Sequence, residues 1–114
     1  MSVKPYVLTE RGVLRCEQVT YPMEERGLQF GDGVYEVVSL YNGAYIWLQE
    51  HLDRLYRSAA AIRLSVPFAP EELSERLEQL RRMNDVHEDA ILYLQVTRGS
   101  FPRNHAFPTE NRPN

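Results

Sequence analysis

The chain has little of several features that would assign a protein to a particular class. It has one cysteine, Cys16, among 114 residues, so no internal disulfide can form and a reducing compartment is favoured. The N-terminal residues show no basic stretch followed by an apolar run, and no segment reaches the ~20 apolar residues of a membrane span. We therefore expect a cytoplasmic protein that has no membrane partner.

Blocks of one charge are also missing. The formal net charge is −3, with acidic and basic residues interleaved, unlike the basic footprint of a protein that binds nucleic acid. His51 and His87 have no further metal ligands at a useful spacing, so no metal site is predicted. With 43% hydrophobic and 25% charged residues, the composition is that of a chain that folds, and its length suits one domain.

Four apolar-rich runs predict two hairpins in the first half of the chain. Gly12 ends the turn of the first hairpin, and Asn42-Gly43 supplies a type I′ turn for the second. Between them, Gly31-Asp32-Gly33 predicts a bend that leads into a strand; it is not a phosphate-binding glycine loop, because no helix follows it. The strands are expected at Tyr6–Leu8, Val13–Val19, Val34–Tyr41 and Ala44–Leu48.

The second half changes to a helical period and then returns to a strand. From Gln49 an apolar stripe predicts one helix, which Pro67 prevents from continuing, and a second helix starts near Pro70 and ends near Asn84. Ala90–Thr97 is predicted to be a last strand, and the residues from 99 to 114 a loop followed by a linker. The stripes are Leu52, Leu55, Tyr56, Ala59 and Ile62, then Leu73, Leu77 and Leu80.

This order predicts an α+β fold, a small domain with a mostly antiparallel sheet and two helices gathered to one side. In the strand Val34–Tyr41 the alternation places Val34, Glu36, Val38 and Leu40 on one side. Tyr35, Val37, Ser39 and Tyr41 lie on the other side.

Several polar residues each allow an ordinary and a functional interpretation. Arg54 is a solvated residue at the edge of its apolar stripe, or its planar guanidinium binds a phosphate. Tyr35 is a packed aromatic at the sheet edge, or it points into a cleft. Arg103 and His105 are exposed loop residues, or they bind a carboxylate together, since arginine gives a permanent charge and histidine a second donor.

Three segments, taken together, resemble one known family. They are residues 26–37 (RGLQFGDGVYEV), residues 50–55 (EHLDRL) and residues 95–105 (QVTRGSFPRNH). In order and spacing they are similar to the fold-type IV (class IV) aminotransferases that depend on pyridoxal 5′-phosphate (PLP). The third segment, with its Pro-Arg-x-His loop, resembles the D-amino-acid aminotransferases within that family.

The resemblance covers the chain from about Tyr6 to Pro108 and implies a role for five residues. Arg54 corresponds to the residue that holds the PLP phosphate. Tyr35 corresponds to a tyrosine that lines the substrate side, and Val37, its next neighbour on the same face, is expected to line the same pocket. Arg103 and His105 correspond to the substrate-carboxylate trap, which in these enzymes comes from the neighbouring subunit of a homodimer.

The resemblance also implies a reaction and its partners. The reaction is amino-group transfer between a D-amino acid and a 2-oxo acid. The alternatives are a relative of the branched-chain aminotransferases or aminodeoxychorismate lyases, which share the first two segments in outline, or a non-catalytic module for dimerisation or ligand binding.

One residue that such an enzyme needs is missing from the chain. The only lysine, Lys4, lies outside all three segments, and in the family the Schiff-base lysine belongs to a larger carboxy-terminal domain. No catalytic residue is therefore assigned here. We expect residues 1–108 to be the amino-terminal small domain and residues 109–114 the start of an interdomain linker, so that this fragment alone is inactive.

Overall fold

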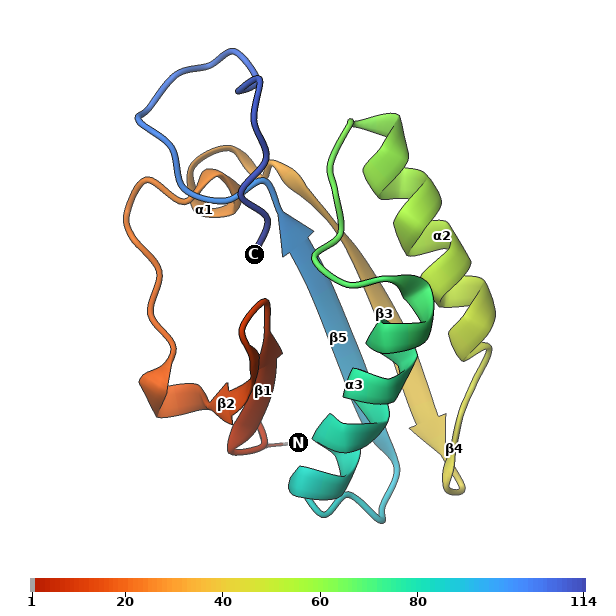
Figure 1. Cartoon of the computed structure of the whole chain (residues 1–114). Helices are drawn as coiled ribbons and strands as arrows, with labels where there is room; N and C mark the ends of the chain where they lie inside the picture. The colour runs from red at the N-terminus through yellow and green to blue at the C-terminus, as the bar shows by residue number, and fades with distance from the viewer. Residues whose placement is uncertain (1) are drawn as a thin grey trace.

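The computed structural model describes residues 2–114. Two β-sheets and three α-helices make up the fold (Figure 1). In chain order the elements are β1 (Tyr6–Thr9), β2 (Gly12–Arg15), a 3-10 turn η1 (Cys16–Gln18), α1 (Arg26–Phe30), β3 (Gly33–Tyr41), β4 (Ala44–Tyr45), α2 (Leu48–Ala61), α3 (Pro70–Met83) and β5 (Ala90–Thr97). The predicted α+β class is confirmed.

All strand pairs are antiparallel. β1 and β2 form a separate hairpin, in which Thr9 pairs with Gly12. The second sheet has the order β4-β3-β5, and Gly33 pairs with Thr97 at one end and Leu40 with Ala90 at the other. The central sheet therefore joins residues that are far apart in sequence, which the local pattern alone could not pair.

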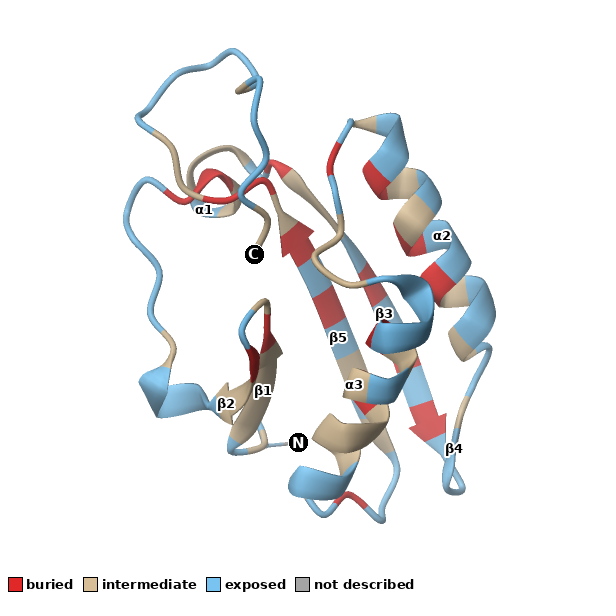
Figure 2. Ribbon diagram, in the orientation of Figure 1, coloured by how far each residue is buried: buried red, intermediate tan, exposed pale blue. Residues whose placement is uncertain are grey.

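The core lies between this sheet and the two long helices. Val38 and Leu94 from the sheet pack against Leu52, Leu55 and Leu77 from the helices, and all of these side chains are buried. Figure 2 shows buried and more exposed positions alternating along β5. Because strand side chains alternate between faces, the helices cover one face and leave the other open.

Two predicted strands were wrong in their bounds, and one short helix was not predicted. The second strand ends at Arg15 rather than Val19, because η1 begins at Cys16, whose thiol is exposed. β4 ends at Tyr45 rather than Leu48, because Trp47 takes a positive φ of 53° and α2 begins directly after it. The helix α1 was not expected at all, since five residues are too few for an apolar period to show.

The segment after β5 has no helix or strand, as expected, yet it folds back on the domain. Thr97 N–H donates to Asn114 O at 2.9 Å, and Asn114 N–H donates to Thr97 O at 3.3 Å. Gly99 (φ 97°) permits this return, because a Cβ there would collide with the carbonyl oxygen of Arg112. The assignment of residues 109–114 as linker stays a prediction.

Candidate functional site

Arg54 is held by a buried carboxylate. Glu36 on β3 is 4% exposed and accepts hydrogen bonds from Arg54 Nε (2.7 Å) and Nη2 (2.8 Å) on α2. His51, almost one helical turn earlier, lies with Nδ1 2.6 Å from the same carboxylate. The two helix residues therefore meet one acid from the sheet, and the two-point contact fixes the plane of the guanidinium.

The environment keeps Glu36 charged. Hydrogen bonding by Arg54 lowers the pKa of Glu36 from 4.5 to about 2, against the effect of burial, and His51 adds to the lowering. The Arg54 side chain is itself 60% exposed. A guanidinium has five N–H donors, and within residues 2–114 Arg54 Nη1 has no hydrogen-bond partner. This outer edge can therefore bind an anion.

Tyr35 and Val37 lie on the open face of the sheet, away from the helices. They are 64% and 42% exposed, and Tyr35 stacks on Tyr93 with ring centroids 5.9 Å apart. Val37 pairs directly with Tyr93 across β3 and β5. The predicted substrate-lining residues thus share one apolar surface with Tyr93, which the sequence did not single out because it depends on strand register.

Arg103 and His105 lie together around one aromatic ring. The Arg103 guanidinium is 5.6 Å from the centroid of Phe30 on α1, and the His105 ring is 5.4 Å from it. Both residues are exposed. Between them in the chain, Asn104 O accepts a hydrogen bond of 2.6 Å from Arg26 Nη1. This bond connects the loop of Arg103 and His105 to α1.

A second carboxylate holds this end of the domain. Asp32 Oδ2 accepts from Arg26 Nε at 2.7 Å and from Arg98 Nε at 2.8 Å, and all three side chains are at most 3% exposed. Arg98 also donates to the carbonyls of Ile62 and Arg63 just past α2. Burial would raise the pKa of Asp32, but the hydrogen bonds from the two arginines hold it below its ordinary value.

The structure brings the predicted residues together only in part. Tyr35 and Val37 share a surface, and Arg103 and His105 share a ring. Within residues 2–114 no hydrogen bond or ring contact joins either pair to the other or to Arg54.

The sequence pattern does not connect Glu36 with Arg54 and His51, nor Arg26 with Arg98. One signal was available. The alternation had placed Glu36 among apolar neighbours, and a buried acid needs a partner.

No helix within residues 2–114 has the length and apolar character needed to span a membrane. No group of three or more possible metal-ligating side chains gathers there either.

The chain belongs to the amino-transferase class IV family, whose family model matches residues 33–113. The match includes both Arg54 and the loop of Arg103 and His105.

The curated relatives narrow the comparison. The chain is 50% identical over 105 residues to a D-alanine aminotransferase of Listeria monocytogenes, which covers 91% of this chain and 36% of that protein. It is 45% identical over 101 residues to the D-alanine aminotransferase of Bacillus licheniformis, covering 89% of this chain and 35% of that protein. The chain thus spans little more than a third of the length of these relatives.

Solved structures confirm the fold. A branched-chain amino acid aminotransferase from Escherichia coli superposes with a TM-score of 0.89 at 21% identity, covering 97% of this chain and 39% of that one. A hypothetical aminotransferase from Mycobacterium tuberculosis, in its PLP-bound form, gives a TM-score of 0.72 at 23% identity, covering 95% and 36%. At these identities the likeness shows the fold and not the substrate.

Proposed function

We propose that the chain is the amino-terminal small domain of a PLP-dependent D-amino-acid aminotransferase. The whole enzyme transfers an amino group between a D-amino acid and a 2-oxo acid. The main support from the geometry is Arg54, whose guanidinium is fixed by a buried carboxylate while its outer edge remains exposed. The 50% identity to a D-alanine aminotransferase supports the choice of D-amino acids over branched-chain L-amino acids.

The residues of this chain suit the group that the family binds. Arg54 would hold the phosphate of PLP, because its planar donors match phosphate oxygens and the charge of Glu36 orients them. Bound PLP supplies an electron sink that makes the Cα–H bond of an amino acid easier to break. The lysine that binds the cofactor covalently comes from the carboxy-terminal domain in this proposal.

The remaining predicted residues serve the substrate in this proposal. Tyr35 and Val37 line its apolar side and exclude water from it. Arg103 and His105 bind its carboxylate, which fixes the orientation of Cα. Because this pair has no contact with Tyr35 or Arg54 within the described chain, we propose that it acts in the neighbouring subunit of a homodimer. The expected cytoplasmic location stays a prediction.

The proposal is tested in the longer polypeptide that contains this chain. We expect Arg54→Ala to weaken PLP binding by roughly 10- to 100-fold, as for other lost charge-assisted contacts. Arg57→Ala is the matched control, since Arg57 is an exposed arginine on the same helix. Equal PLP affinity in the two variants, measured by fluorescence titration, would exclude the phosphate role.

Arg103→Ala separates the substrate role from the cofactor role. We expect it to raise the KM for D-alanine far more than the Kd for PLP, because a carboxylate contact acts on the substrate alone. A comparable loss of both would argue against the carboxylate trap. Activity with L-leucine but not D-alanine in the unmodified enzyme would instead favour the branched-chain alternative.

A further inference from the structure

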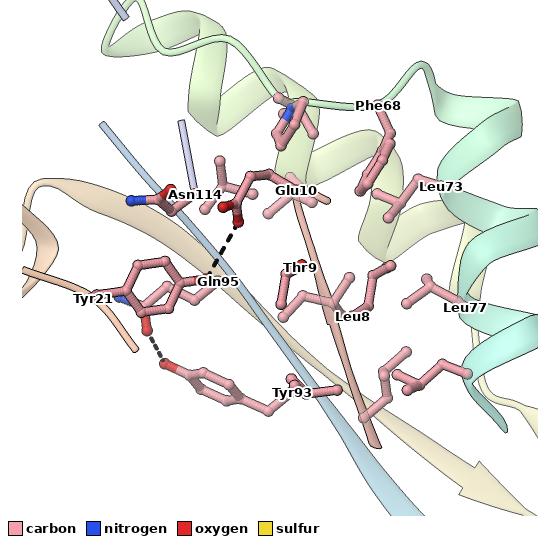
Figure 3. A pocket seen from close by; sticks show the side chains of 18 residues that line it. Leu8, Thr9, Glu10, Tyr21, Phe68, Leu73, Leu77, Tyr93, Gln95 and Asn114 are labelled. Carbon is pink, nitrogen blue, oxygen red and sulfur yellow. Dashed lines mark hydrogen bonds between the residues drawn. The ribbon is translucent and has the colours of Figure 1, made fainter. Parts of the chain in front are cut away.

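The segment that follows β5 is fixed at its two ends by contacts that do not involve its middle. At the far end, Asn114 pairs with Thr97, and its side chain lines, together with Gln95, a cavity of about 150 Å³ between β1, β5 and α3 (Figure 3). At the near end, Phe101 N–H donates to Glu24 O at 3.3 Å. The loop between these anchors, which carries the proposed carboxylate-binding pair, therefore depends on other contacts for its position.

Among the described residues, a single hydrogen bond joins residues 102–106 to the rest of the domain. It runs from Arg26 Nη1 on α1 to Asn104 O, at 2.6 Å. This carbonyl belongs to the planar peptide group between Asn104 and His105, so the bond fixes the plane of that peptide. Arg103 and His105 lie on either side of Asn104 in the chain. The directions of their two side chains therefore depend on Arg26.

The Arg26 guanidinium is itself held on two sides. Its Nε donates to the buried Asp32 at 2.7 Å, and its central carbon lies 4.7 Å from the ring centroid of Phe30 on the same helix. The Arg26 side chain is 2% exposed, so water does not compete for these contacts. The ring of Phe30 also contacts Arg103 and His105. A buried guanidinium and one aromatic ring thus support the loop together.

The charge of Asp32 alone does not call for Arg26. Arg98 Nε already donates to Asp32 Oδ2 at 2.8 Å, and the Arg98 side chain is equally buried. A second buried guanidinium leaves one positive charge in excess of this acid, and burying a charge without its own partner costs free energy. The other bonds of Arg98 go to two carbonyls after α2 and to an asparagine beyond the loop. Two arginines therefore share one acid, but only Arg26 reaches the loop.

We propose that Arg26, packed on the ring of Phe30, is a positioning residue for substrate binding. It holds the peptide at Asn104 so that Arg103 and His105 present their donors together to one carboxylate. The role rests on the proposed function, in which this pair binds the substrate carboxylate. Because Arg26 acts through the loop, its loss should weaken the binding of carboxylate substrates and leave the binding of PLP unchanged.

The test uses the longer polypeptide that contains this chain and begins with Arg26→Lys. Lysine keeps a positive charge beside Asp32, but its compact ammonium lacks the planar fork that serves Asp32 and Asn104 O at once. Arg98→Lys is the matched control, because it makes the same change at the other arginine of Asp32. We expect Arg26→Lys to raise the KM for D-alanine about 10-fold, with the Kd for PLP within about twofold. Arg98→Lys should leave both values within about twofold, whatever its effect on stability.

A double-mutant cycle separates positioning from a general loss of structure. Since Arg26 acts through Arg103 and its neighbour, adding Arg26→Lys to Arg103→Ala should raise the KM by less than about threefold, whereas independent effects would multiply. A full 10-fold rise in both backgrounds would overturn the proposal. So would an equal rise in KM with Arg98→Lys, because the effect would then come from the ion pair and not from the loop.

The same measurements distinguish the positioning role from the proposed function. If Arg103→Ala raises the KM for D-alanine and Arg26→Lys does not, the carboxylate role stands and the positioning role is overturned. If Arg103→Ala leaves the KM unchanged, both fail together. Should Arg26→Lys not fold, Phe30→Leu provides the second variant. We expect it to raise the KM about threefold through the lost ring contacts, and an unchanged KM would overturn the proposal.

Discussion

Two carboxylate clusters in this domain use the same chemistry in different surroundings. Asp32 lies between Arg26 and Arg98, and all three side chains are buried. Glu36 lies between Arg54 and His51, where the acid is buried but Arg54 is 60% exposed. The aromatic rings of Phe30 and Phe107 cover the first pair of arginines, whereas the donors on the outer edge of Arg54 remain open.

The difference separates a structural cluster from one that fits the binding role proposed for Arg54. In the Asp32 cluster other donors of the two arginines go to protein oxygens, those of Asn104, Ile62, Arg63 and Asn111. These bonds join α1, the end of α2 and the loop of Arg103 and His105. In the Glu36 cluster one edge of the arginine is used for orientation, and the other has no hydrogen-bond partner among the described residues. The buried Asp32 therefore holds a loop in position, whereas the buried Glu36 orients the exposed guanidinium of Arg54.

The largest expected effect comes from Asp32→Asn. It leaves two buried guanidinium groups without their common counter-charge, and breaking a buried pair costs about 3–5 kcal/mol. Urea unfolding should show this loss. Asp53→Asn is the control, because Asp53 is exposed and within residues 2–114 accepts a side-chain hydrogen bond from Gln49 alone. Its change should stay within about 0.5 kcal/mol. Similar losses of unfolding free energy in the two variants would mean that Asp32 does not stabilise the fold more than an exposed aspartate does.

Glu36→Gln should cost less, about 2 kcal/mol at neutral pH, because its main partner is exposed to water. The pKa of Glu36 is lowered from 4.5 to about 2, so its stabilising contribution is complete above about 4.5. It is lost as the pH falls towards about 2. The difference in unfolding free energy between the two proteins should therefore narrow over this window. If the difference in unfolding free energy stayed constant between about pH 4.5 and 2, the stabilising role assigned to the charged Glu36 would be contradicted.

Arg54→Ala tests whether the exposed arginine is needed for the fold. We expect only a small loss of stability, since water can reach Glu36 once the side chain is removed and His51 remains. Arg98→Ala is the buried counterpart and should cost about 3 kcal/mol or more. Thermal unfolding of both variants under one condition provides the measurement. Equal losses would mean that burial does not distinguish the two arginines.

Phe30→Leu should have the smallest effect on stability, below about 1 kcal/mol for a half-buried side chain of similar volume. It removes the ring that Arg103 and His105 share. The loop should therefore become more mobile, which the 15N relaxation of residues 102–106 would show. Unchanged relaxation would mean that the bond from Arg26 to Asn104 alone orders the loop.

Sequence alone predicted much of the local structure. The apolar period placed α2 and α3, because residues three or four positions apart, such as Leu52, Leu55 and Ala59, lie on one face of an α-helix. The Asn42-Gly43 turn and the run Ala90–Thr97 located β3 and β5 for the same kind of local reason. The motifs of residues 26–37, 50–55 and 95–105 identified the family, which the comparisons confirm.

Only the tertiary structure decided how these pieces meet. The pairing of Tyr35 with Tyr93, the meeting of Glu36 with Arg54, and the convergence of Arg26 and Arg98 on Asp32 all depend on strand register and helix placement. The short helix α1 depends on them as well. Patterns in sequence report which face of an element is apolar. The partners of a polar group are set by residues distant in the chain, and burial then requires that those partners be found.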